Sequence, residues 1–298
     1  MHFHFTDFNH CDIGKRSIED LILIVSKQAE ALGHTTSFWN EQNWFDYSSN
    51  SINVVLESFA DNPNTIKQIS AAHKHGAKFL YIATEEPGTV GFNNTGDQGM
   101  IDRQNAFAEA AKYCEGVLHL VPGQAVTDWY SQFAPSVYAE LGWAPSLMRP
   151  RETTPEYTFG FFGQMSARRE RILEQFAPDI LVCPGILLHQ EQRDAEMRRC
   201  KVILQIRRFD EMGLISSSRC NTALSIGRPV IAEPHPIPTW WENVVQFSNS
   251  KESFYDEAQL LAANWLEEYK RQLVRFATIL TPEVCLGAPL KKLGLVCV

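Results

Sequence analysis

The sequence of 298 residues predicts an α/β protein with two domains, each built around a parallel sheet. Short apolar runs alternate along the chain with amphipathic helical segments, which is the pattern of successive β-α-β units. The length exceeds what one hydrophobic core commonly holds. A segment that contains Pro145, Pro150 and Pro155 divides the chain near its middle and is the predicted linker.

The first half of the chain alternates predicted strands and helices. The strands are expected at residues 1–5, 35–39, 52–58, 77–84 and 116–121, and the helices at residues 18–32, 65–75 and 102–113. Gly33, Gly76 and Gly116 follow these helices, and glycine is common where a helix ends.

The second half repeats the alternation after the proline segment. Strands are expected at residues 157–162, 179–183, 201–206 and 230–232, helices at 167–176 and 190–200, a short helix before Gly227, and one long helix at 253–280. The corresponding domains are residues 1–148 and residues 157–262, followed by a C-terminal helix and tail at 263–298.

Composition narrows the function classes. Hydrophobic residues make up 44% and charged residues 21% of the chain, as in an ordinary globular protein, and the formal net charge of −8 argues against a general nucleic-acid binder. The seven cysteines form no C-x-x-C pair, so we expect no zinc or other metal site. Neither a signal peptide nor a transmembrane segment is expected, which favours a cytoplasmic protein and leaves peripheral contact with a membrane open.

The segment from Ser216 to Pro234, SSSRCNTALSIGRPVIAEP, predicts an anion site. Three serines at 216–218 can cap a short helix that Gly227 ends and that a buried strand follows. The free N–H groups at the start of that helix lie beside Arg219, and the positive end of a helix attracts phosphate.

The motif R-x-x-x-A-L-x-x-G-x-P-V-I in this segment resembles the donor-side helix of group 1 glycosyltransferases with the GT-B fold. Arg219, Gly227 and Pro229 match, while Thr222 stands where much of that family has a ribose-binding glutamate. The resemblance implies two Rossmann-like domains that face a cleft. In that family the first domain binds the acceptor, the second binds the nucleotide sugar, and the last helix crosses back to the first domain.

A second cationic segment, FGFFGQMSARR at 159–169, joins a strand to a helix through Gly163. This glycine can admit a diphosphate, and Arg168 or Arg169 can neutralise it, although both arginines also fit a solvated helix face. Arg207 follows the strand at 201–206, where ligands of open α/β sheets collect; pairing with neighbouring acidic residues is the alternative. The donor-binding candidates are Gly163, Arg168, Arg169, Arg207, Ser217, Ser218, Arg219, Asn221 and Thr222.

Candidates for a catalytic base follow strands of the first domain. Asp12 and His10 belong to the segment TDFNHCDIGKR after the first strand, and Glu85 and Glu86 to TEEPG after a later strand. Each can accept a proton from an acceptor hydroxyl. Helix capping, core packing and ordinary loop positions are the alternatives for these residues.

These observations predict a metal-independent glycosyltransferase without a cofactor. Its expected partners are a nucleotide-sugar donor, which is a co-substrate, and a saccharide or other acceptor with a hydroxyl group. Two alternatives stay open: a nucleotide-sugar epimerase of the same fold, and a non-catalytic homologue that binds nucleotide or protein.

Overall fold

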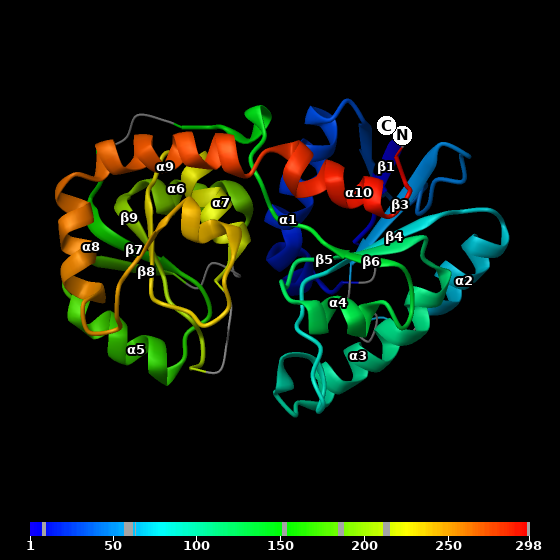
Figure 1. Cartoon of the computed structure of the whole chain (residues 1–298), viewed down its shortest axis with the longest axis horizontal. Coiled ribbons are helices and arrows are strands. Elements are labelled where there is room, and N and C mark those ends of the chain that lie inside the picture. Colours follow the sequence, from blue (N-terminus) through cyan, green and yellow to red (C-terminus); the bar gives the residue numbers. More distant parts are fainter. Residues whose placement is uncertain are drawn as a thin grey trace. The chain divides into compact units, whose positions relative to one another are not determined.

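The structure is a computed structural model that describes residues 1–7, 10–56, 62, 64–150, 154–183, 188–210 and 215–296. Contacts divide the chain into two compact units. The first unit contains Met1–Lys15, Val25–Glu140 and Pro282–Val298, and the second contains Arg16–Ile24 and Leu141–Thr281. Each unit consists of a parallel sheet covered by helices (Figure 1).

The first unit has a six-stranded sheet in the order β2-β1-β3-β4-β5-β6. Every pairing in it is parallel. All residues of β3 and β4 are buried, as expected for central strands covered on both faces. The strands are β1 (His2–Phe5), β2 (Thr35–Phe38), β3 (Ser51–Leu56), β4 (Phe79–Ala83), β5 (Gly116–His119) and β6 (Ser136–Tyr138).

Helices cover both faces of this sheet (Figure 1). One core joins Ile69, Phe107 and Tyr130, which lie on three successive helices, to Phe79 and Tyr81 of β4. These helices are α2 (Thr65–Lys74), α3 (Gln98–Ala110) and α4 (Gln124–Tyr130); α1 (Asp12–Ala31) and α10 (Ala288–Lys292) lie on the other side.

The second unit has a five-stranded sheet in the order β11-β10-β9-β7-β8. Its pairings are also parallel. The central strands β7 and β9 alternate their side chains between two apolar layers. The strands are β7 (Tyr157–Phe162), β8 (Ile180–Cys183), β9 (Cys200–Gln205), β10 (Val230–Ala232) and β11 (Gln246–Phe247).

Two layers of helices enclose this second sheet (Figure 1). Leu173 and Phe254, from two different helices, pack with Phe159 and Leu204 in the core on one face. The buried Leu224 belongs to a helix on the other face. The helices are α5 (Ala167–Leu173), α6 (Gln190–Arg198), α7 (Ser217–Ser225), α8 (Phe254–Ala263) and α9 (Trp265–Ile279).

The predicted fold class is confirmed, and most element predictions agree with the structure to within a few residues. Residues 57 and 58 of one predicted strand lie outside the described residues. Among the α-helices and strands of the described residues, the sequence did not predict the short elements α4, β6, β11 and α10. Two element boundaries were wrong: α1 begins at Asp12 rather than at residue 18, and the long helix at 253–280 is two helices that meet at Asn264.

Candidate anion site in the second unit

The candidate site lies at the carboxyl ends of β7 and β9. The chain passes from β7 to β8 on one side of β7 and returns to β9 on the other, so the connections diverge between β7 and β9. Ligands of open α/β sheets bind at such a switch point. Gly163 directly follows β7, and Arg207 lies just beyond β9.

Arginines gather around these strand ends. Arg168 and Arg169 come from α5, Arg193 from α6 and Arg219 from α7, while Arg207 and Arg208 follow β9. Side chains from distant parts of the sequence therefore place an unusual density of positive charge at one edge of the sheet.

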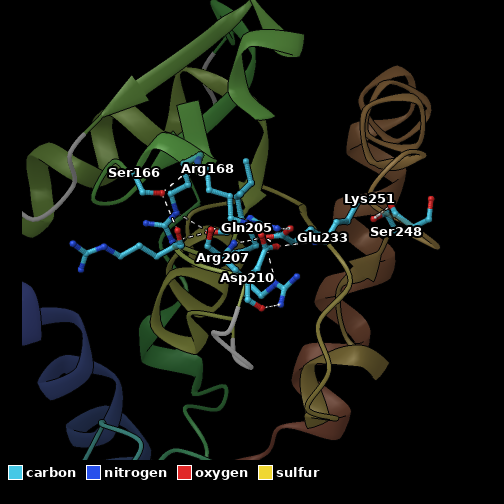
Figure 2. Close-up of polar contacts among 12 residues, drawn as sticks. Ser166, Arg168, Gln205, Arg207, Asp210, Glu233, Ser248 and Lys251 are labelled. Atoms are coloured by element: carbon cyan, nitrogen blue, oxygen red, sulfur yellow. Dashed lines mark hydrogen bonds and ion pairs between the residues drawn. The ribbon is translucent and has the colours of Figure 1, made fainter. Parts of the chain in front are cut away.

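Part of this charge is balanced by Glu233, a carboxylate that is 2% exposed and follows β10. Arg168 donates from Nη1 at 2.9 Å and from Nη2 at 2.5 Å to the two oxygens of Glu233. The backbone N–H of Arg207 also donates to Glu233, and the Arg207 Nε lies 3.6 Å from the same carboxylate. The predicted phosphate ligands Arg168 and Arg207 are thus engaged by an internal carboxylate (Figure 2).

Asp210 extends this network to the surface. Its Oδ1 accepts hydrogen bonds from Lys251 Nζ at 2.7 Å and from Arg168 Nε at 2.9 Å (Figure 2). These two cations, Lys251 first, lower the pKa of Asp210 to about 2. The side chain of Asp210 thus pairs with Arg168, while Arg207 Nη1 donates to the backbone carbonyl oxygen of Asp210 at 2.9 Å.

Arg169 supports the loop that leads into the site. Its guanidinium donates to the carbonyl oxygen of Ile206 at 2.7 Å and to that of Gln164 at 2.5 Å, and it lies over the ring of Phe161. Burial, followed by the charge of Arg219, lowers the pKa of Arg169 to about 9. Ser166 accepts the backbone N–H of Arg169 at 3.3 Å and so caps α5.

A cavity of about 210 Å³ opens between α6, α7 and the end of β7. It lies within the second unit, which includes residues 16–24 of α1. The cavity is smaller than the roughly 300–1,000 Å³ of a site that encloses a drug-sized ligand. Its lining consists of Ser17, Asp20, Phe162, Gly163, Gln164, Arg193, Met197, Ser216, Ser218 and Arg219.

Arg219 is one of the two arginines among the described residues that line this cavity. Its Nη1 donates to Gln205 Oε1 at 2.9 Å, and its guanidinium lies 5.6 Å from the centroid of the Phe161 ring. Burial, with the nearby charge of Arg193, lowers the pKa of Arg219 to about 10. Both effects disfavour the isolated cation, so an anion that enters the cavity would stabilise it.

The start of α7 supplies a second source of positive potential. Ser216 occupies the N-cap position, but within the described residues its side chain does not cap α7; its Oγ lies 3.2 Å from that of Ser218 instead. The predicted serine cap is therefore wrong. The first N–H groups of a helix have no partner within the helix, and here they begin beside the cavity.

The other candidates in α7 lie elsewhere. Ser217 is partly buried in the first turn, and Thr222 is buried. Asn221 is also buried and donates from Nδ2 to the carbonyl oxygens of Leu141 at 3.2 Å and Gly142 at 2.7 Å. The structure thus brings Gly163, Ser218 and Arg219 to one cavity and gives Asn221 an anchoring contact.

The proposed bases belong to the first unit. His10 is buried, and Asp12 is exposed in the first turn of α1 instead of lying on a loop as predicted. Glu85 and Glu86 follow β4, and Asn93 binds both residues: its Nδ2 donates to the Glu85 carboxylate at 2.5 Å and its Oδ1 accepts the Glu86 N–H at 3.0 Å.

Arg193, Asp20 and Glu233 also belong to this site, although they were not among the residues predicted from the sequence. Arg193 lies in the segment QEQRDAEMRR, whose charge is typical of a solvated helix face, yet its side chain is buried. The signal for Glu233 was available, because this residue directly follows a buried strand at the carboxyl edge of the sheet. Asp20 carried no such signal.

The described residues contain neither a cluster of metal ligands nor a single helix that could span a membrane. No group of three or more His, Cys, Asp or Glu side chains in this part of the chain is placed to hold a metal ion. No single described helix is long and apolar enough to cross a membrane, although α9 and the segment Glu283–Lys292 reach that length and hydropathy when taken together.

No family model and no curated protein sequence matches the chain. Solved structures do match. WaaG, a glycosyltransferase involved in lipopolysaccharide biosynthesis, is 10% identical with a TM-score of 0.52, and the match covers 98% of this chain and 99% of that one. A mutant of S. aureus TarM, in complex with fondaparinux, α-GlcNAc-glycerol and UDP, is 12% identical with a TM-score of 0.52.

The match to TarM covers 84% of this chain but 56% of TarM, so the chain spans little more than half of that protein. At these identities the likeness shows the fold. The chain has the α/β fold with two Rossmann-like units that is found in GT-B glycosyltransferases, and the predicted resemblance is confirmed at that level.

Proposed function

We propose that this protein is a glycosyltransferase that moves a sugar from a nucleotide-sugar donor to a hydroxyl acceptor without a metal ion. The observation that carries the proposal is the cavity at the end of β7, where Arg219, Arg193 and the start of α7 meet. The shared fold with WaaG supports the same class of reaction.

Sugar transfer from such a donor releases a nucleoside diphosphate, whose negative charge develops in the transition state. Fixed cations and helix N–H groups stabilise that charge when they are in place before the reaction. Arg219 and α7 would do so for the diphosphate. The cavity of about 210 Å³ suits this part of the donor, with the nucleoside and the sugar extending beyond it.

The acceptor proton needs a base or must leave with the diphosphate. We propose the base among Asp12, Glu85, Glu86 and His10 of the first unit. Glu85 has one structural argument in its favour: the bond from Asn93 Nδ2 orients its carboxylate. A positioned carboxylate typically accelerates such a proton transfer by about 10²–10⁴-fold.

The first experiment identifies the donor. UDP, GDP, ADP and CDP are screened by thermal shift, because a ligand that binds only the native state raises the melting temperature. UDP is tested first, since it is bound in the TarM structure. The matching nucleotide sugars are then assayed for release of nucleoside diphosphate with and without saccharide acceptors. Binding without release or transfer would contradict a transferase and leave a nucleotide-binding protein.

Arg219→Ala is expected to weaken binding of the selected nucleoside diphosphate by roughly 10- to 150-fold. This range corresponds to the loss of one charge-assisted contact of about 1.5–3 kcal/mol. Isothermal titration calorimetry measures it. Arg171→Ala is the matched control, because Arg171 is an exposed arginine of α5 outside the cavity lining. Equal affinities for the two variants would remove Arg219 from the site.

A further inference from the structure

The cavity already contains an internal anion. Of the described residues that line it, Arg193, Arg219 and Asp20 carry charge. The Arg193 Nη2 lies 2.6 Å from Asp20 Oδ1, and the two side chains are 7% and 13% exposed. A buried guanidinium of the cavity is therefore held by a carboxylate of the same cavity.

The surroundings of Asp20 disfavour the charged form of its carboxyl group. Burial raises the pKa of Asp20, and the charge of Arg193 opposes that shift. Asp20 also acts on Arg219, where its negative charge favours the guanidinium that burial and Arg193 disfavour. One carboxylate thus serves two arginines, as a phosphate group in the cavity would.

We propose that Asp20 is an internal counter-anion which a phosphate group of the ligand displaces from Arg193, so that Arg193 is a ligand-binding residue and Asp20 sets the affinity of the cavity for anions. This inference rests on the proposed anion site. Arg193 can then offer its planar fork to two phosphate oxygens, the geometry for which guanidinium is suited.

The proposal predicts opposite effects for two partners of one ion pair. Asp20→Asn removes the competing charge and should tighten binding of inorganic pyrophosphate by about tenfold, the scale of one charge-assisted contact. Arg193→Gln should weaken it by a similar factor. Asp20→Glu keeps the charge and should bind pyrophosphate with nearly the parent affinity.

Glu19→Gln is the control for a lost carboxylate on the same helix. Glu19 accepts the backbone N–H of Gln190 through Oε2 at 3.1 Å and is not part of the cavity lining. Because the charge of Glu19 lies outside the cavity and is screened by salt, its substitution should change pyrophosphate affinity by less than about twofold. Circular dichroism of each variant establishes that it is folded.

Calorimetric titration with pyrophosphate separates the possible failures. If Arg219→Ala weakens binding while Asp20→Asn leaves it unchanged or weakens it, the counter-anion proposal is wrong and the anion site stands. If Asp20→Asn and Glu19→Gln tighten binding equally, the tighter binding follows from the loss of any negative charge, and the specific role of Asp20 as counter-anion is wrong. A parent protein that does not bind pyrophosphate would overturn the anion site together with this inference.

Discussion

Gly163 shows how a single residue shapes the anion site. A Cβ atom at this position would lie 2.8 Å from Arg219 Nη2 and 3.2 Å from the ring of Phe161. Real Cβ atoms essentially never lie closer than 3.0 Å to another atom, so a side chain at residue 163 must displace the Arg219 guanidinium. The position of Arg219 therefore requires a glycine at residue 163.

Gly163→Ala should lower pyrophosphate affinity by roughly tenfold, because Arg219 loses its position for a charge-assisted contact. The guanidinium is the flexible end of its side chain and can move, so the free energy of unfolding should change by about 1 kcal/mol or less. Calorimetry and urea denaturation measure the two effects. In an Arg219→Ala background the Gly163→Ala change should have no further effect on affinity, and an additive loss would contradict the mechanism.

Whether a site residue could be predicted from the sequence depends on its place in the secondary structure. Gly163, Ser218 and Arg219 lie next to strand or helix ends, and the sequence shows such ends through glycine, serine and the apolar runs around them. Asp20 lies in the interior of α1 and Arg193 in the first turn of α6, two helices that are far apart in the sequence. Their pairing depends on how those helices pack, which helix periodicity alone does not report.

At the scale of elements, Gln272 completes the pairing of a short strand. In register, β11 pairs only with Ile231 and Ala232 of β10. The preceding residue, Val230, instead forms two hydrogen bonds with the side chain of Gln272: its N–H donates to Oε1 and its carbonyl oxygen accepts from Nε2, each at 2.9 Å. A buried helix side chain thus replaces a missing strand residue.

Gln272→Met keeps the side-chain volume but removes both bonds, which leaves two buried backbone groups of Val230 without their partner. Each such group costs about 1–3 kcal/mol, so we expect the free energy of unfolding to fall by about 2–6 kcal/mol. Urea denaturation measures the change. Gln259→Met makes the same replacement on the exposed face of α8 and is the control; equal losses would show that the two bonds contribute little.

Element boundaries were harder to predict than the elements. Asn264 separates α8 from α9 with a φ of −124° and a ψ of 32°, yet no proline or glycine marks it and the apolar residues continue on both sides. The start of α1 was placed too late because Cys11 at its N-cap makes no side-chain cap. The strands were located well because their buried apolar runs are continuous.

At the scale of the whole molecule, buried histidines couple stability to pH. Burial lowers the pKa of His4, His119 and His235. In neutral His119 the proton lies on Nδ1, because Nδ1 is 2.8 Å from the carbonyl oxygen of Val121 and must donate to it; Nε2 lies 3.0 Å from the Thr127 hydroxyl oxygen.

A histidine with a lowered pKa in the folded state stabilises the fold above its unfolded pKa of about 6.5, and this contribution is lost as the pH falls through the folded pKa. His119→Asn should therefore be less stable than the parent at pH 7.5, and the difference should narrow at pH 5.5. Urea denaturation of both proteins at the two pH values tests this. Burial raises the pKa of Asp7 and Asp20, which changes stability with pH in the opposite direction. This effect is common to the parent and the variant, so it cancels in the difference between their free energies of unfolding. A constant difference would contradict it.

The anchoring of α7 by Asn221 has a mechanical consequence. The helix of nine residues spans about 13 Å, and an α-helix of this length does not stretch. Its first turn borders the cavity that Arg193 and Arg219 line. Farther along the helix, Asn221 donates to the carbonyl oxygen of Gly142, and the carbonyl oxygen of Ser225 accepts the N–H of Arg149 at 2.8 Å. If a bound anion displaced the first turn, α7 would move as a rigid body, and residues 141–149 would move with it.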